Sequence, residues 1–177
     1  MQYKPYGPFT IPRNRMLVAR NTESKREFWD LVEDVSEGLS NACGCYIFSI
    51  RGRAWYVGIA EKQSFKNECF AAHKINQYNE ALQKVQGVPE LIFLAKITPT
   101  GYFANPSRQG HKDIQIVENM LIGFALARNS ELQNIRGTKF LREMIIPGIL
   151  NYGRGVGKNK SVQALKKALG IRRLVSL

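Results

Sequence analysis

The sequence has little of what marks secreted, membrane-spanning or zinc-stabilised proteins. It contains only three cysteines, and Cys43 and Cys45 stand two apart on an expected strand, where their side chains point the same way. With Cys69 they form an odd trio that indicates neither a disulfide framework nor a zinc site. No apolar run approaches the length that crosses a membrane, so we expect no membrane partner.

The first residues also lack the apolar core of a secretory signal, because prolines and polar residues interrupt them. A cytoplasmic location is therefore the default expectation. A length of 177 residues, of which 44% are hydrophobic and 23% charged, is typical of one globular domain with appended ends.

Acidic residues are scarce, since 14 Asp and Glu stand against 26 Lys and Arg and give a net charge of +12. The excess is uneven along the chain. Residues 1–40 balance to zero (six basic against six acidic), residues 41–133 carry +3 (ten against seven) and residues 134–177 carry +9 (ten against one). Such a charge attracts polyanions, so nucleic acid is one explanation of the basic end and a solubilising surface is the other.

The amino-terminal part predicts an arm followed by a helix. Residues 1–21 contain three prolines and no sustained hydrophobic period, which favours an extended arm. A capping box from Ser24 to Glu27 then begins an amphipathic helix that Gly38 helps to end. Its apolar stripe consists of Phe28, Leu31, Val32, Val35 and Leu39.

Two β-rich runs, residues 44–50 and 54–58, surround a short glycine-containing turn and predict a hairpin. With a three-residue turn, Tyr46 stands opposite Gly58 and Phe48 opposite Tyr56, all on one face. A two-residue turn would shift the register by one and separate the two tyrosines.

The remaining elements complete an α+β pattern. We predict a helix over 64–84, a buried third strand over 91–97, a loop over 99–111, a helix over 113–128 and a capped helix over 161–169. The stripe of the helix over 113–128 consists of Ile114, Val117, Leu121 and Phe124. The expected fold is a small three-stranded antiparallel sheet flanked by helices, with an N-terminal arm and helix (1–41), a core (42–136) and a basic C-terminal extension (137–177).

The predicted hairpin carries Gly-x-Tyr at 44–46 and Tyr-x-Gly at 56–58, and Glu118 and Asn134 follow further along the chain. This arrangement resembles the GIY-YIG nuclease superfamily, in which the paired tripeptides precede a helix, a third strand, a helix with one glutamate, and an asparagine. The match covers about residues 42–136. It implies a metal-dependent endonuclease that hydrolyses phosphodiester bonds of nucleic acid, with double-stranded DNA the expected partner and Asn134 among the catalytic residues.

Glu118 is the expected metal ligand. It lies four residues after Ile114 and three before Leu121, on or beside an apolar stripe, where a carboxylate is costly unless it is paired or bound to metal. An ion pair at the edge of the stripe is the alternative. Mg²⁺, or Mn²⁺ in its place, is the expected ion, because Mg²⁺ accepts few protein carboxylates and keeps several waters.

The resemblance also implies that Tyr46 or Tyr56 orients or deprotonates the attacking water, and the sequence leaves the choice open. Free tyrosine titrates near pH ~10, so a tyrosine that acts as a base needs cations nearby. The alternative for each is a core tyrosine with a bonded hydroxyl.

Two positions depart from the family pattern. Ile59 stands where the family commonly has lysine, and residues 65–68 lack the arginine that follows in the next helix. The segment 70–74 resembles a variant branch in which His73 and Lys74 occupy that slot. We expect Lys74 to be the catalytic cation with His73 beside it on the substrate, and since adjacent helical residues point about 100° apart, only one of them can fill the slot.

Basic residues outside this set are expected to contact phosphates, which gives affinity without sequence information. They are Lys66, Arg136, Lys139, Arg154, Lys158 and Lys160. Two other functions remain open. One is a catalytically silent nucleic-acid-binding module on the same scaffold, favoured by Ile59 and Glu68, and the other is an interaction protein whose tail binds an acidic partner.

Overall fold

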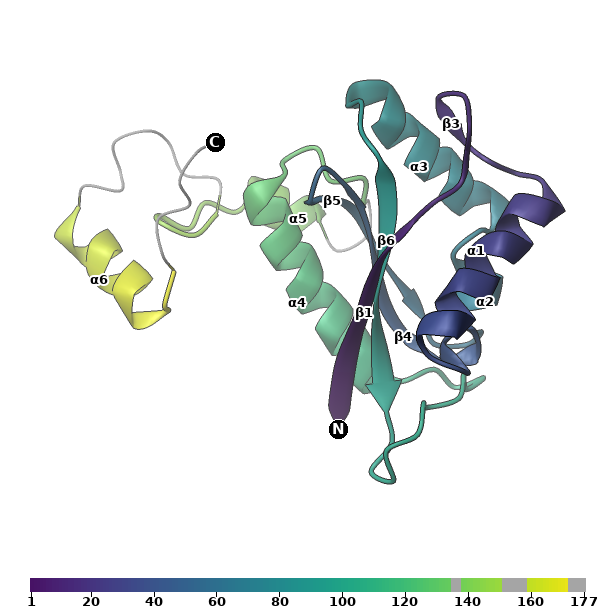
Figure 1. The fold of residues 1–177 in the computed structure, drawn as a ribbon. Coiled ribbons are helices and arrows are strands. Elements are labelled where there is room, and N and C mark those ends of the chain that lie inside the picture. The colour runs from purple at the N-terminus through teal and green to yellow at the C-terminus, as the bar shows by residue number, and fades with distance from the viewer. Residues whose placement is uncertain (135–137, 151–158, 172–177) are drawn as a thin grey trace.

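A computed structural model describes residues 1–134, 138–150 and 159–171. In that part of the chain, the main sheet is antiparallel and runs in the order β1-β6-β4-β5. Three helices, α1, α2 and α3, lie on one side of the sheet and α4 lies on the other (Figure 1). The predicted α+β class and helix-flanked antiparallel sheet are confirmed.

The strands of this sheet are β1 (Gln2–Thr10), β4 (Gly44–Ile50), β5 (Arg53–Ala60) and β6 (Pro89–Ile97), and the four helices are α1 (Thr22–Val35), α2 (Phe65–Glu68), α3 (Ala72–Lys84) and α4 (Lys112–Arg128). Smaller elements are the ribbon of β2 (Arg13–Asn14) and β3 (Leu17–Val18), the 3-10 turn η1 (Leu39–Asn41), and the helices α5 (Lys139–Glu143) and α6 (Lys160–Ala168).

The predicted strand count of three is wrong, because part of the expected arm is a strand. β1 pairs with β6 from Gln2 opposite Ile97 to Thr10 opposite Glu90, with an irregularity between Tyr6 and Phe9. As the outermost strand, β1 tolerates proline, since an edge strand leaves one row of its N–H groups unpaired and Pro8 lies within the irregularity. The prolines that indicated a free arm are therefore compatible with a place at the edge of the sheet.

The hairpin has the predicted pairing of its tyrosines, but its turn is shorter than predicted. Its turn has two residues, Arg51 and Gly52, both with positive φ, and Ile50 stands opposite Arg53. A bulge then leaves Trp55 without an opposite residue, so that Phe48 faces Tyr56 and Tyr46 faces Gly58 as predicted. The bulge thus cancels the one-residue shift that a two-residue turn introduces.

The predicted helices differ at their ends and faces. Asn21 caps α1 by accepting a hydrogen bond from the Ser24 amide at 3.2 Å, so the helix begins before the predicted capping box. Its predicted stripe residues Leu31 and Val35 are exposed and Trp29 is buried instead. Phe124 of α4 is also exposed, at 65%. The helix predicted over 64–84 is broken between α2 and α3.

The outer edge of β5 is covered by the segment that follows α4, not by another strand. The Asn129 amide donates to the Ala54 carbonyl at 2.8 Å, and the Gln133 backbone N–H donates to the Trp55 carbonyl at 2.7 Å. This cover protects the first half of an edge strand that would otherwise offer unpaired backbone groups. The far half of β5, towards Ala60, borders a pocket.

Candidate active site

This pocket, called here the β5 pocket, has a volume of about 450 Å³ and collects side chains from both sides of the sheet. Because β5 is an edge strand, residues of α2 and α3 on one face and of α4 on the other meet around its edge. The sequence-predicted residues among its lining are Tyr56, His73, Lys74, Glu118 and Asn134. Five of the six predicted catalytic residues are therefore neighbours in space.

Lys74 forms the centre of a short polar chain in this pocket. Its Nζ donates a hydrogen bond to the Tyr56 hydroxyl oxygen at 2.5 Å and lies 3.3 Å from a carboxylate oxygen of Glu68. Burial lowers the pKa of Lys74, but the Tyr56 hydrogen bond and the Glu68 charge outweigh that effect and the pKa lies above its ordinary value. Lys74 is thus a buried ammonium whose charge is directed at the tyrosine oxygen.

Glu118 reaches the β5 pocket from α4. Burial raises the pKa of its carboxyl, the charge of Lys74 partly offsets this, and the charges of Glu61 and Glu68 raise the pKa further. Across the described ranges Glu118 forms no ion pair, so the edge-of-stripe salt bridge considered from the sequence is absent there. The result is a partly buried carboxylate with no ion-pair partner among the described residues.

Tyr46 is the predicted catalytic residue that the structure keeps out of the pocket. It is completely buried, and its ring lies over Gly58, where a Cβ atom would overlap the ring. Burial raises the pKa of Tyr46 well above its ordinary value, with a smaller contribution from Tyr78. The hydroxyls of Tyr46 and Tyr78 lie close enough to shift each other's pKa, but within the described residues neither hydroxyl has a partner at hydrogen-bond geometry. Tyr56, not Tyr46, is the tyrosine that reaches the pocket.

Asn134 lines the pocket but uses its amide elsewhere. Its side-chain oxygen accepts from the Val57 backbone N–H at 2.9 Å, and its nitrogen donates to the Val57 carbonyl at 2.7 Å. The side chain therefore pairs with the edge of β5 as a neighbouring strand would. This geometry favours a positioning role next to Tyr56 over the predicted direct catalytic role.

The other predicted residues are spread more widely. His73 is exposed at the β5 pocket while Lys74 is buried in it, an arrangement that agrees with Lys74 in the cation slot and His73 beside it. Lys66 is exposed on α2, does not line the pocket and lowers the pKa of Glu33. Lys139 opens α5 and Lys160 opens α6. Arg136, Arg154 and Lys158 lie outside the described residues.

Two acidic residues of the site were missed in the sequence. Glu68 pairs with Lys74 across the break between α2 and α3, a separation that no helical spacing would reveal. Glu61 is buried just after β5 and raises the pKa of Glu118 from a distance. In the sequence Glu68 favours a catalytically silent module, because residues 65–68 lack an arginine, yet in the structure Glu68 is the ion-pair partner of Lys74.

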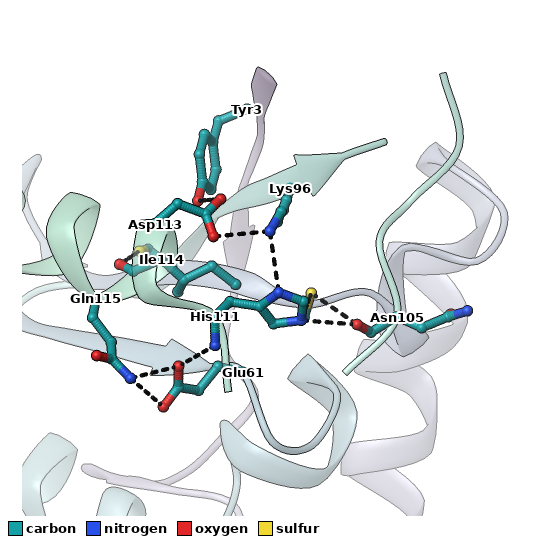
Figure 2. A network of polar contacts seen from close by, with 10 residues as sticks. Tyr3, Glu61, Lys96, Asn105, His111, Asp113, Ile114 and Gln115 are labelled. Atoms are coloured by element: carbon teal, nitrogen blue, oxygen red, sulfur yellow. Dashed lines mark hydrogen bonds and ion pairs between the residues drawn. The ribbon is translucent and has the colours of Figure 1, made fainter. Parts of the chain in front are cut away.

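A polar network fixes the start of α4 and thereby the position of Glu118 (Figure 2). Asp113 accepts from the Tyr3 hydroxyl at 2.8 Å and from Lys96 Nζ at 2.9 Å. Lys96 also lies 3.1 Å from Nδ1 of His111, whose backbone N–H donates to Glu61 at 2.8 Å. Strands β1 and β6 and the end of β5 are thus joined to the first turn of α4.

This network should make the fold sensitive to acid. Burial raises the pKa of Asp113, but the hydrogen bonds from Lys96 and Tyr3 outweigh it and the pKa lies below its ordinary value. A lowered folded-state pKa means that Asp113 stabilises the fold above about pH 4 and loses this contribution as the pH falls further. Asp113→Asn should lower the free energy of unfolding at pH 7 by roughly 1–3 kcal/mol and should flatten its decline in acid.

Thermal unfolding between neutral pH and about pH 2 measures this effect. Asp34→Asn, an exposed change on α1, is the control and should follow the wild type. A decline in acid that is equally steep for Asp113→Asn and the wild type would show that the network is not its source.

The residues of the β5 pocket fit some metal ions and not others. In the part of the chain that the structure describes, no three His, Cys, Asp or Glu side chains come close enough to form a complete protein cage. Glu118 alone, as a single carboxylate that the described residues leave without an ion pair, suits an ion that keeps most of its water, as Mg²⁺ does.

Comparison of the chain with known protein families, with curated proteins and with solved structures finds no match. Among the described helices, none is long and apolar enough to cross a membrane. The features that bear on function are therefore the geometry of the β5 pocket and the charge of the chain.

Proposed function

We propose that the protein is a metal-dependent endonuclease of the GIY-YIG type that hydrolyses phosphodiester bonds in nucleic acid, with double-stranded DNA as its expected substrate. One observation carries the proposal: Tyr56, hydrogen-bonded to Lys74, shares one pocket with Glu118. Tyr56 and Lys74 together suit proton transfer, and Glu118 suits the binding of a divalent ion. The net charge of +12 supports a polyanionic substrate.

Each residue of the pocket has a chemical task in this reaction. To act as the base, Tyr56 would first lose its hydroxyl proton to solvent, and the phenolate oxygen, held by the Lys74 ammonium, would then accept the proton of the attacking water. Glu118 would hold Mg²⁺ or Mn²⁺, which when bound supplies charge neutralisation at the phosphate and the departing oxygen. His73, at the rim, is placed to contact the substrate.

Asn134 and Glu68 support these groups. Asn134 holds the backbone of Val57, the residue next to Tyr56, and so fixes the direction of the tyrosine. Glu68 forms an ion pair with the ammonium of Lys74, which is also hydrogen-bonded to Tyr56. Removal of either support should loosen the geometry of the pair without deleting a reacting group.

A silent nucleic-acid-binding module is the second candidate, and the same ion pair favours it. Glu68 neutralises part of the charge of Lys74, the cation that would otherwise face the substrate phosphate. The cleavage assay decides between the two functions. Plasmid, linear DNA and RNA are incubated with Mg²⁺ or Mn²⁺, with a chelator in the control reactions. Binding without cleavage on all three substrates would establish the silent module.

Tyr56→Phe and Tyr46→Phe form a matched pair in this assay. Tyr56→Phe should lower the cleavage rate by roughly 10²–10⁴-fold, because it removes the group that moves the proton. Tyr46→Phe should leave the rate within a few fold and keep or raise the melting temperature, since it deletes a buried hydroxyl that has no hydrogen-bond partner among the described residues. If Tyr46→Phe abolishes cleavage and Tyr56→Phe does not, the assignment of the base is wrong.

A further inference from the structure

A second pocket, of about 530 Å³, adjoins the β5 pocket, and the two share Asn134 in their linings. It is called here the basic pocket. Its cationic lining residues are Lys84, Lys139 and Arg142, which come from the end of α3 and from α5. Glu131 is the one acidic residue among the described lining residues, so the pocket has an excess of positive charge.

The cations of this pocket differ in their roles. Arg142 donates to the backbone carbonyls of Ser130 and Leu132, the latter at 2.6 Å, and so fixes the wall of the pocket. Lys84 and Lys139 are exposed, and within residues 1–134, 138–150 and 159–171 neither forms an ion pair. Two lysines thus face a concave surface whose shape is held by the backbone.

We infer that the basic pocket binds a phosphate group of the nucleic acid, through Lys84 and Lys139, several nucleotides along the strand from the phosphate that is cut. This inference rests on the proposed function in so far as the β5 pocket handles the scissile phosphate. Lys74 and Lys84 are ten residues apart on α3, or roughly 15 Å at 1.5 Å per residue. That spacing corresponds to about four steps of 3.4 Å along one strand of a duplex.

The basic pocket thereby gives the enzyme a contact on one side of the cut, which orients the strand in the β5 pocket. Lys84 and Lys139 recognise phosphate charge and not base identity. The phosphate is either an internal diester of the backbone or a terminal monophosphate at a strand end, since both present the same oxygen atoms. The two sources differ in whether the nucleic acid must have an end.

The test is the salt dependence of binding, measured with a chelator present so that no cleavage is needed. The slope of log K for binding against log[salt] is negative, and Lys84→Gln/Lys139→Gln should reduce its magnitude by about 1.8 on duplex DNA, or about 0.9 for each lost contact. The matched control is Lys4→Gln/Arg26→Gln, which removes the same charge from exposed sites on β1 and α1. The control should change the slope far less.

Equal slopes for the two double variants, or no change in either, would overturn the inference. Closed circular DNA and linear duplexes with or without 5′-phosphates identify the source of the phosphate. If Lys84→Gln/Lys139→Gln reduces the magnitude of the salt slope relative to the wild type on closed circles, the bound phosphate is an internal diester. If the double variant reduces it only on duplexes with 5′-phosphates, the bound phosphate is a terminal group. Failure of the proposed function would give a different result. If the wild type cleaves no nucleic acid but the two double variants still differ in their salt slopes, the nuclease proposal is wrong and the phosphate site is supported.

Discussion

Glu118→Gln should abolish metal-dependent cleavage, leave nucleic-acid binding nearly unchanged and raise the melting temperature. The change removes a charged oxygen ligand but keeps the shape of the side chain, so a loss of at least roughly 10²–10³-fold in rate is expected. Binding persists because the contacts that supply affinity are cationic. The gain in stability follows from the position of this carboxyl in the β5 pocket.

The raised pKa of Glu118 explains why Glu118→Gln should increase the melting temperature. Burial and the charges of Glu61 and Glu68 raise the folded-state pKa of Glu118 by more than the charge of Lys74 lowers it. Its ionisation therefore opposes folding increasingly as the pH rises above the unfolded value, and fully above the folded-state value. Below the unfolded value near pH ~4 the carboxyl is protonated in both states and the penalty disappears. The stabilisation by Glu118→Gln should therefore appear at neutral pH and vanish in acid.

Three measurements check this expectation: cleavage with Mg²⁺, binding with a chelator, and melting temperature against pH in the absence of metal. Glu80→Gln, an exposed change on α3, is the matched control and should resemble the wild type in all three. Full cleavage by Glu118→Gln would eliminate the metal assignment. A melting temperature that falls at neutral pH would instead show that Glu118 stabilises the fold.

Lys74→Met should reduce the cleavage rate by roughly 10²–10³-fold with little change in substrate affinity. Methionine keeps most of the apolar stem, so the change removes mainly the ammonium that bonds to Tyr56. The expected loss is the few kcal/mol that a fixed electrostatic donor contributes when charge develops in a reaction. A steady-state experiment should therefore show a lower kcat and an almost constant KM.

Lys74→Met also leaves Glu68 without its ion-pair partner, although the hydrogen bond from Gln63 remains, and the loss costs stability. The double variant Glu68→Gln/Lys74→Met removes both charges and should recover much of the melting temperature while remaining inactive. Lys66→Met, an exposed change on α2 outside the β5 pocket, should be mild. If Lys66→Met is inactive and Lys74→Met retains cleavage, the cation of the site has been assigned to the wrong residue.

Local patterns in the sequence predicted the hairpin, the buried strand β6 and the helix α4 that carries Glu118. They could not predict β1 as a strand, because its pairing with β6 joins residues far apart in the chain. The prolines of β1 argued for a free arm, and only its edge position makes them acceptable. The register of the tyrosines was predicted correctly although the turn was not, because the bulge at Trp55 leaves no clear periodic signal.

In the candidate site, too, local sequence patterns predicted some features and could not predict others. The spacing of Glu118 on a stripe of α4 predicted its partial burial, and the β5 pocket brings it to Tyr56 and Lys74. Spacing could not separate Tyr46 from Tyr56, since both stand on one face of the hairpin and only their depth differs. It also could not reveal that both amide atoms of Asn134 are engaged by the backbone of Val57.

The pairing of β1 with β6 has a consequence for how the chain folds during synthesis. The β4–β5 hairpin is local and can form soon after it leaves the ribosome, whereas Gln2 must wait for Ile97. Until β6 has been made, β1 and the edge of β4 that later pairs with β6 are available to other chains, which favours strand exchange and aggregation. Overproduction of this protein should therefore give soluble material most readily when translation is slowed or the temperature is reduced.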